Sequence, residues 1–422
     1  MVSEIGNNIL VTGATGFLGK VVIEELLRLR EIYSISRIIL LLRKKGPLDA
    51  MTRFEKYIVT SPCFASLPQG WKQFTQVVEG DLASPDCGLN ARDYDQVRKT
   101  VTHIIHTAAC IKFDSTVSEA ISSNVDSSCN VLALAKDCHN LQQLVVTSTA
   151  YVSPPHQGPI YENLVELPCP ASKLVSELKN GVLAKEEAIA ATGHPNIYSL
   201  SKCLAEHMIC ETKGCLPVTL VRPSIICAAI HFPEPGWIDS RAAFGGLVLG
   251  FSTGALLVLD GRPETKLDIV PVDVVAESLI YETFRKGAKI HKQTDLRIVF
   301  SVATVERSLT LADACKMLEI FFQRRLQYIG PQGHMLDLYK LVYQDLPFHL
   351  DATVNGIKGT KSREAQSKKI WKVVNGMSAV FRSYTNSTHD FRPKHAKVHF
   401  DPVEYMHIIC QGVQKNLRDS KL

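Results

Sequence analysis

Two side chains four residues apart, Tyr198 and Lys202, are well suited to acid–base chemistry. On a helix, residues at this spacing lie on one face, so a phenol and an ammonium would project into the same site. The ammonium favours the phenolate, which predicts a lowered pKa for Tyr198 and a role as general acid. About 50 residues earlier, Thr149 follows an apolar run, with Ser148 as the near alternative. Either hydroxyl could hold a substrate oxygen while Tyr198 protonates it.

A glycine-rich loop near the N-terminus is the second chemical feature. Its first glycine permits a tight turn, its second lets backbone amides approach a pyrophosphate, and its third lets a helix pack closely on a strand. A helix that begins here would offer free N–H groups and the positive end of its dipole to phosphates. The loop predicts dinucleotide binding through Thr12, Gly13, Thr15, Gly16, Phe17, Leu18 and Gly19.

The residues after the second apolar run bear on the choice of dinucleotide. An NAD site carries a carboxylate there, about 20 residues after the glycines, to bind the ribose 2′-hydroxyl. This sequence has Arg43, Lys44 and Lys45 instead, and a guanidinium suits the 2′-phosphate of NADPH. We therefore expect NADPH, bound through Arg43, although the basic residues could simply flank a strand end in solvent. Asp81, after the third apolar run, could approach the adenine or cap a helix.

The segments that must position these residues alternate between strands and helices. Apolar runs typical of buried parallel strands cover Ile9–Thr12, Arg37–Leu42, Thr75–Glu79, Val101–His106, Leu144–Thr147 and Val218–Val221. Helical repeats fill the intervals, notably Leu18–Arg30, Thr116–Cys138 and Tyr198–Thr212. This alternation predicts right-handed crossovers and an α/β fold, with a doubly wound parallel sheet of the Rossmann type.

Composition excludes several classes of protein. Of the 422 residues, 45% are hydrophobic and 21% charged, which is usual for globular chains and unlike disordered or coiled-coil proteins. The net charge of +5 is concentrated in residues 331–422, with 14 Lys or Arg against 8 Asp or Glu. No basic block predicts a nucleic-acid partner. Twelve scattered cysteines, without C-x-x-C pairs or metal-finger spacing, indicate a reducing compartment and no metal site. We expect a soluble protein without a cleaved N-terminal signal.

Further stretches give these motifs a family resemblance. With TGATGFLG and YSLSK, the chain resembles the extended short-chain dehydrogenase/reductases. Within that superfamily it is similar to the alcohol-forming fatty acyl-CoA reductases, also called the male-sterility family. The stretches that carry this resemblance are Ile105–Asp114, Ser148–Val152, Val221–Ile225, Glu234–Asp239 and Asp268–Val275. The resemblance is strong over roughly residues 9–285, whereas Ser240–Gly246 and Val398–Tyr405 depart from the family pattern.

The resemblance implies NADPH-dependent reduction of a long-chain fatty acyl-CoA to a fatty alcohol through an aldehyde. Thr149 would hold the carbonyl oxygen, and Tyr198 would stabilise or protonate the developing oxyanion. Lys202 would tune Tyr198 and bind the nicotinamide ribose, and Ala108 would contact the cofactor. Two alternatives stay open. One is a thioester reductase that stops at the aldehyde or acts on a carrier-bound acyl chain, and the other is an NADP-binding protein without turnover.

The alternation of strands and helices fades after about residue 300. We expect an NADP-binding reductase domain with acyl-substrate elements over residues 1–300 and a smaller, mostly helical domain over 301–422. Ser308–Arg325 has the pattern of one amphipathic helix. The longest apolar stretch, Gly245–Leu259, is shorter than the roughly 20 residues of a membrane span. It could line an acyl tunnel, rest on a membrane surface or form a buried helix.

The sequence ends in Ser420-Lys421-Leu422. A C-terminal S-K-L tripeptide is a peroxisomal address that a receptor reads, not a membrane anchor. We therefore expect import into peroxisomes, with the import receptor as a partner. This expectation agrees with the cysteine pattern and with acyl-CoA chemistry.

Overall fold

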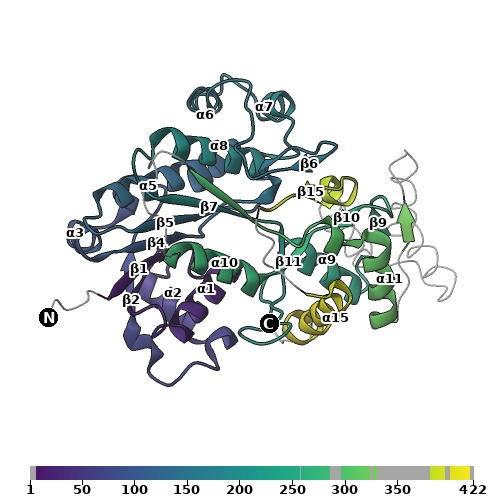
Figure 1. Ribbon diagram of the computed structural model, residues 1–422, viewed down its shortest axis with the longest axis horizontal. Coiled ribbons are helices and arrows are strands. Elements are labelled where there is room, and N and C mark those ends of the chain that lie inside the picture. Colours follow the sequence, from purple (N-terminus) through teal and green to yellow (C-terminus); the bar gives the residue numbers. More distant parts are fainter. Residues whose placement is uncertain are drawn as a thin grey trace, which may run out of the picture.

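A seven-stranded parallel sheet forms the centre of the molecule (Figure 1). The computed structural model describes residues 6–256, 258–285, 296–323, 327–329, 381–394 and 400–418. The strands of the sheet are β1 (Asn7–Thr12), β2 (Ile35–Leu42), β3 (Thr75–Glu79), β4 (His103–His106), β5 (Gln143–Thr147), β7 (Val218–Pro223) and β12 (Arg297–Ser301). They pair in the order β12-β7-β5-β4-β1-β2-β3, which reverses between β1 and β4. This reversal is that of a doubly wound sheet, so the predicted fold class is confirmed.

Helices cover both faces of this sheet. The predicted helices Leu18–Arg30 and Tyr198–Thr212 are confirmed as α1 (Phe17–Arg28) and α8 (Ile197–Thr212). The other helices along the sheet are α2 (Ala50–Phe54), α3 (Ala91–Thr100), α4 (Val117–Ala120), α5 (Ser127–Asp137) and α10 (Val272–Phe284). Figure 1 shows α1 and α10 on one side of the sheet and α5 and α8 on the other.

The two covered faces explain why β2 is apolar along most of its length. Ile38 and Leu40 lie in a buried cluster with side chains of α1 and α10. Ile39 and Leu41 lie in a second buried cluster with side chains of α5. Alternate side chains of a strand point to opposite faces, so helices on both faces require an unbroken apolar run.

Beyond the sheet, short strand pairs join segments that are far apart in the sequence. The pairs are β6 (Pro159–Ile160) with β15 (Asp390–Phe391), β8 (Ile225–Cys227) with β11 (Ile269–Pro271), β9 (Val258–Asp260) with β14 (Gln327–Ile329), and β10 (Lys266–Leu267) with β13 (Leu309–Thr310). The pairing of β6 with β15 brings residues near the C-terminus beside Pro159–Ile160.

The described segments beyond residue 300 share a hydrophobic core with earlier elements. α11 (Leu311–Phe322) and α15 (Pro402–Val413) lie in one buried cluster with α9 (Ala243–Ser252). α11 confirms the helix predicted within Ser308–Arg325. The division into two domains at residue 300 stays a prediction. β12 spans that position, and residues 330–380 lie outside the described residues.

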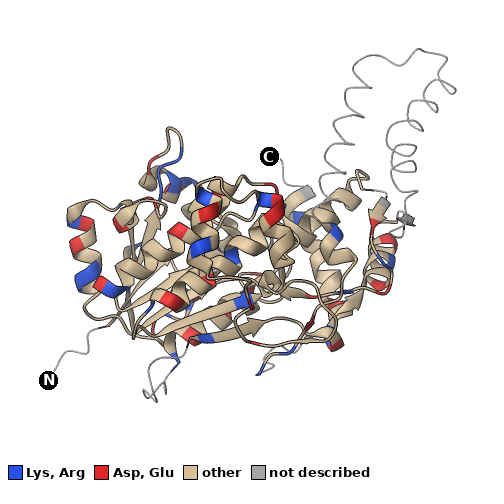
Figure 2. Ribbon diagram, turned by 90° about the horizontal axis from the view of Figure 1, so that it is seen from above, with Lys and Arg blue, Asp and Glu red and all other residues tan. Residues whose placement is uncertain are grey.

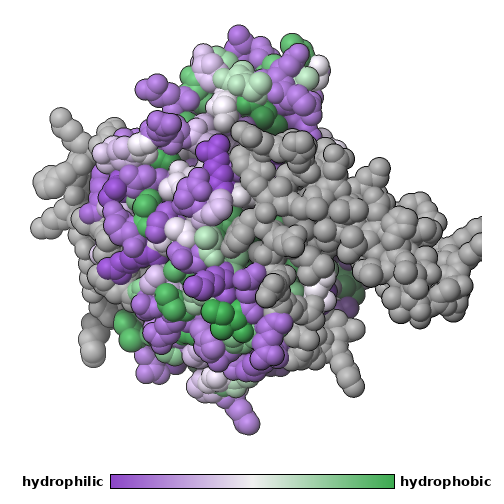
Figure 3. Space-filling model, turned by 90° about the vertical axis from the view of Figure 1, so that its right-hand side faces the viewer, coloured by the Kyte–Doolittle hydropathy of each residue, from purple (hydrophilic) through white to green (hydrophobic). Residues whose placement is uncertain are grey.

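Charged and apolar side chains are intermixed on the surfaces that the figures show. In Figure 2, Lys and Arg are interspersed with Asp and Glu along the outer helices. On the face shown in Figure 3, hydrophobic residues lie in small groups among hydrophilic ones. Within the described part of the chain, no helix has both the length and the apolar character needed to cross a bilayer. Much of the apolar stretch Gly245–Leu259 lies in α9, where Leu247, Val248 and Phe251 are buried.

Several carboxylates gather between α1 and α10. Glu24 and Glu25 of α1 are buried, and Asp273 and Glu277 of α10 lie near them. Burial raises the pKa of Glu25 to about 8, and the neighbouring carboxylates add to the rise while Arg28 opposes it. The packing of α1 on α10 therefore favours a protonated Glu25 over much of the neutral range.

We expect Glu25→Gln to remove a pH dependence of stability. Between the ordinary pKa of 4.5 and the raised value of about 8, folded Glu25 keeps a proton that the unfolded chain has lost. Its contribution to the free energy of unfolding therefore falls by about 1.4 kcal/mol per pH unit as the pH rises through that range. Gln resembles the protonated form of Glu25. In urea unfolding, the free energy of the variant minus that of wild type should therefore be larger at about pH 8.5 than at about pH 5.

The matched control is Glu31→Gln, which removes an exposed carboxylate shortly after the same helix. Its unfolding free energy should follow the pH dependence of the wild type. Parallel pH profiles of the unfolding free energy for Glu25→Gln and wild type would contradict the raised pKa of Glu25.

Candidate active site

The glycine loop joins β1 to α1 through two close backbone approaches. Gly13 has a φ of +74°, and a Cβ there would lie 2.6 Å from the backbone N of Ala108. A Cβ on Gly19 would lie 2.2 Å from the carbonyl oxygen of Gly13. Gly16 is the N-cap of α1 and supplies no capping side chain. The first N–H groups of α1 are thus left for another acceptor, as a dinucleotide phosphate site requires.

The two threonines of the loop have structural partners. Thr12 is fully buried, and its hydroxyl pairs with Nδ1 of His106 at 2.8 Å. Burial lowers the pKa of His106 to about 3, so the ring is neutral. The Thr15 hydroxyl accepts a hydrogen bond of 2.9 Å from Arg53. Thr12 and Thr15 do not line the cavity described below, and their contact with a cofactor stays a prediction.

Arg53, on α2, is a residue that the sequence analysis missed. It is 8% exposed and donates to the Arg43 carbonyl oxygen at 2.6 Å as well as to Thr15. It therefore ties the glycine loop to the end of β2. Burial lowers the pKa of Arg53, and the charge of Arg43 adds to that fall. Asp81 is exposed, and its carboxylate accepts from the N–H of Ala83, which caps a turn.

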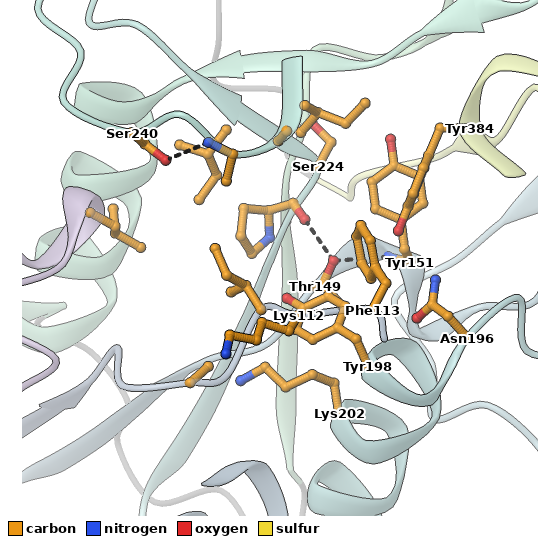
Figure 4. Close-up of a pocket in the computed structure, with 18 of the residues that line it drawn as sticks. Lys112, Phe113, Thr149, Tyr151, Asn196, Tyr198, Lys202, Ser224, Ser240 and Tyr384 are labelled. Atoms are coloured by element: carbon orange, nitrogen blue, oxygen red, sulfur yellow. Dashed lines mark hydrogen bonds between the residues drawn. The ribbon is translucent and has the colours of Figure 1, made fainter. Parts of the chain in front are cut away.

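The predicted catalytic residues meet in one cavity of about 1190 Å³ (Figure 4). β5 ends beside the cavity, and the two residues that follow this strand, Ser148 and Thr149, line it. The helix α8 contributes Tyr198 and Lys202. The same cavity reaches the glycine loop, where it is lined by Gly13, Gly16, Phe17, Leu18 and Gly19. The structure thus brings most of the predicted cofactor residues and all three predicted catalytic residues to a single space. Arg43, Asp81 and Ala108 lie outside its lining.

Lys202 and Thr149 are held by backbone groups at the strand ends. The Lys202 ammonium donates to the Thr147 carbonyl oxygen at 2.7 Å. The Thr149 hydroxyl accepts from the N–H of Tyr151 at 3.3 Å and donates weakly, at 3.5 Å, to the Pro223 carbonyl oxygen. The Ser148 hydroxyl is buried and has no hydrogen-bond partner among the residues that the structure describes. Both hydroxyls are therefore available to a substrate oxygen, and the choice between them stays open.

The pKa of Tyr198 differs from the expectation. Burial raises it above its ordinary value, and a hydrogen bond with Thr149 opposes the rise. Burial also lowers the pKa of Lys202 to about 8, and the charge of Glu206 opposes that fall. The expected lowering of the Tyr198 pKa was wrong, because burial removes the solvent that would stabilise the phenolate and Tyr384 adds to the rise. A protonated phenol is nevertheless the form that can donate a proton.

A buried ion pair anchors α8 one turn beyond Lys202. Glu206 accepts two hydrogen bonds from Arg222 of β7, and the Nε–Oε1 distance is 2.9 Å. Arg222 also donates to the Asn163 carbonyl oxygen at 2.8 Å. At the start of the helix, the Asn196 side chain accepts from the N–H of Ser199 at 2.9 Å. These contacts set the position of α8 against the sheet.

An aromatic wall completes the cavity and was not predicted from the sequence. The ring centroid of Phe113 lies 5.4 Å from that of Tyr198 and 5.8 Å from that of Tyr384. The ring centroids of Tyr384 and Tyr151 are 4.5 Å apart. Tyr384 comes from near the C-terminus, where Thr385 binds the Asp260 carbonyl through its hydroxyl at 2.6 Å. Phe113 and Tyr151 fall within stretches that resemble the family, which could have drawn attention to them. No local pattern points to Tyr384.

Metal-ligating side chains do not gather in the part of the chain that the structure describes. No group of three or more His, Cys, Asp and Glu there could hold a metal ion. Beside the glycine loop, the catalytic part of the cavity offers the hydroxyls of Ser148, Thr149 and Tyr198 and the ammonium of Lys202.

The chain is similar to known proteins in sequence. An NAD-binding family model described as "Male sterility protein" matches residues 11–279, so the chain carries an NAD(P)-binding domain. Fatty acyl-CoA reductase wat of Drosophila melanogaster is 33% identical over 278 residues, which cover 64% of this chain and 53% of that protein. Fatty acyl-CoA reductase 1 of Homo sapiens is 30% identical over 288 residues, 67% of this chain and 55% of that protein. The chain spans about half the length of these relatives.

Solved structures share the fold. The terminal R domain from the myxalamid PKS-NRPS biosynthetic pathway has a TM-score of 0.69 at 19% identity, covering 98% of this chain and 92% of that chain. The reductase domain of a nonribosomal peptide synthetase from Mycobacterium tuberculosis has a TM-score of 0.62 at 17% identity, with 97% and 92% covered. At these identities the likeness shows the fold alone.

Proposed function

We propose that this chain, which belongs to the male sterility protein family, reduces long-chain fatty acyl-CoA to fatty alcohol with NADPH. The observation that carries the proposal is the meeting of Thr149, Tyr198 and Lys202 with the uncapped N-terminus of α1 in one cavity. The relatives named fatty acyl-CoA reductases support the substrate class. An aldehyde-releasing reductase remains the alternative to separate by product analysis.

The residues present fit a bound dinucleotide. The close approaches at Gly13 and Gly19 shape the turn and the packing that bring the uncapped N–H groups of α1 to the cavity, where a pyrophosphate would bind. When bound, NADPH supplies the hydride. Arg53 binds the backbone carbonyl of Arg43 at the end of β2, where the sequence has no carboxylate to receive a 2′-hydroxyl. Two guanidinium groups there favour a 2′-phosphate, and hence NADPH over NADH.

The mechanism follows from the hydroxyls and the ammonium of the cavity. Thr149 would donate a hydrogen bond to the thioester carbonyl oxygen, and Tyr198 would donate its proton as negative charge develops there. Loss of the CoA thiol from the resulting hemithioacetal leaves an aldehyde. After regaining a proton from solvent, Tyr198 would protonate the alkoxide of the second reduction to give the alcohol. Lys202 would stabilise Tyr198 when its proton has left and would bind the nicotinamide ribose.

The direct test is NADPH oxidation across a series of acyl-CoA chain lengths, with products identified by mass spectrometry. We expect two NADPH oxidised per alcohol formed. One NADPH per aldehyde would favour the alternative reductase, and NADPH binding without any oxidation would favour a protein without turnover.

Tyr198→Phe should abolish most of the activity while leaving the fold intact. General acid catalysis contributes about 10²–10⁴-fold, so NADPH oxidation should fall by that order. NADPH binding, measured by fluorescence, should change little because the variant removes one oxygen from the substrate side. The control is Tyr161→Phe at a tyrosine that is 56% exposed. Near-normal turnover of a folded Tyr198→Phe would contradict its role as proton donor.

Arg43→Gln should reduce the preference for NADPH over NADH. A lost hydrogen bond to a charged group corresponds to roughly 10- to 100-fold in the ratio of dissociation constants. Arg37→Gln is the matched control, because it removes an exposed guanidinium from the other end of the same strand. An unchanged cofactor ratio in Arg43→Gln would place the 2′-phosphate site elsewhere.

We also propose that the chain is imported into peroxisomes through Ser420, Lys421 and Leu422, which lie outside the described residues. The support is the tripeptide itself, which the import receptor reads at a free C-terminus. A fluorescent reporter ending in these residues should accumulate in peroxisomes. A reporter that stays diffuse in the cytosol would contradict the proposal.

A further inference from the structure

Three cationic side chains of the cavity take no part in the chemistry described so far. Lys112 lies in the loop after β4, Arg241 lies just before α9, and Arg382 lies in the segment that carries Tyr384. All three line the cavity and are exposed to solvent, so they form its rim. We use the term rim cations for these three residues.

The rim cations come from opposing walls. Figure 4 shows Ser240 and Tyr384 on opposite sides of the pocket, with Lys112 between them. Arg241 follows Ser240 in the chain, and Arg382 precedes Tyr384 by two residues. A ligand that leaves the catalytic residues for solvent would therefore pass between positive charges.

The rim cations are largely free of acidic partners. Among the described residues, no ion pair joins Lys112 or Arg241 to a carboxylate, although the charge of Lys112 contributes to the lowered pKa of Glu119. Arg382 is 64% exposed, and its Nε lies 3.4 Å from Asp260. A guanidinium carries five N–H donors, so this single contact leaves most of them available. One exposed carboxylate, Asp114, also lines the cavity and reduces the net positive charge of the rim.

The proposed reaction leaves one set of negative charges without a partner. The acyl chain and the thioester are uncharged, and the cofactor phosphates are assigned to the glycine loop and to Arg43 and Arg53. The CoA portion of the substrate carries a diphosphate and a 3′-phosphate beyond its pantetheine arm. Because the thioester must reach Tyr198, this arm leads the phosphates outward toward the rim.

We propose that Lys112, Arg241 and Arg382 bind the phosphate groups of CoA and select acyl-CoA over thioesters that lack them. Guanidinium groups pair with phosphate oxygens in a two-pronged geometry, and a lysine adds a compact charge. The assignment rests on the proposed function. A carrier protein would instead bring one phosphate and its own surface to the same rim. Preference for a carrier-bound acyl chain over acyl-CoA is therefore one of the results that the test distinguishes.

The test compares one acyl chain carried on CoA, on 3′-dephospho-CoA and on pantetheine without phosphates, at saturating NADPH. Wild type should show the highest kcat/KM with acyl-CoA and the lowest with acyl-pantetheine. Arg241→Gln and Lys112→Gln should each lower the ratio of kcat/KM for acyl-CoA to kcat/KM for acyl-pantetheine by roughly five- to tenfold. The change should come mainly from a higher KM for acyl-CoA. Arg382→Gln should have a smaller effect, because its guanidinium is shared with Asp260.

Lys136→Gln is the matched control for charge removal. Lys136 is exposed near the C-terminal end of α5, at the edge of the sheet away from the carboxyl ends of the strands. Its ratio of kcat/KM values should equal that of wild type. Raising the salt concentration should lower the wild-type ratio as well, because exposed charge pairs are screened.

Equal use of acyl-CoA and acyl-pantetheine by wild type would overturn the proposal. Rim variants that lower kcat/KM for acyl-CoA and for acyl-pantetheine by the same factor would also overturn it. A third contrary result is a preference for a carrier-bound substrate over acyl-CoA, with the same variants reducing turnover of the carrier-bound substrate. Free CoA binding, measured by calorimetry, tests the rim separately from turnover. If no thioester is reduced, the proposed function fails. Weaker CoA binding by Arg241→Gln would still support the phosphate site, and unchanged binding would reject it.

Discussion

The buried ion pair between Arg222 and Glu206 fixes the helix on which the proposed chemistry depends. Both side chains are almost wholly shielded from solvent, and Arg222 also donates to the Asn163 carbonyl. Removing one partner of such a pair leaves an uncompensated buried charge, so α8 is held in one position against β7. Lys202 and Tyr198 precede Glu206 by one and two helical turns, and their direction into the cavity follows from this anchor.

The same burial sets the protonation of the groups that α8 presents. It raises the pKa of Tyr198 and lowers that of Lys202 to about 8, while the charge of Glu206 keeps Lys202 from falling further. A phenol that keeps its proton can supply it to a substrate oxygen. A nearby ammonium can stabilise the phenolate that remains. The ion pair therefore contributes to the position of the site and to its electrostatics together.

The dinucleotide-binding fold supplies only part of the cavity. The inner walls come from the glycine loop, the end of β5 and α8, but residues 381–387 close one side with Tyr384. Those residues are held by Asp260 and Arg262, which bond to Thr385. The substrate side of the cavity thus depends on packing between segments more than 100 residues apart.

The sequence by itself determined six of the seven strands of the sheet, several of its helices and the glycine loop with the Tyr198–Lys202 pair, but not the edge strand β12. These features depend on local geometry, because burial on both faces shapes each strand and a helix fixes the spacing of its own residues. Only the tertiary structure decided the contact of Arg53 with Thr15, the place of Tyr384 and the direction of the Tyr198 pKa shift. Each of these depends on distance and solvent exclusion between segments remote in the chain, which no local pattern of residues encodes.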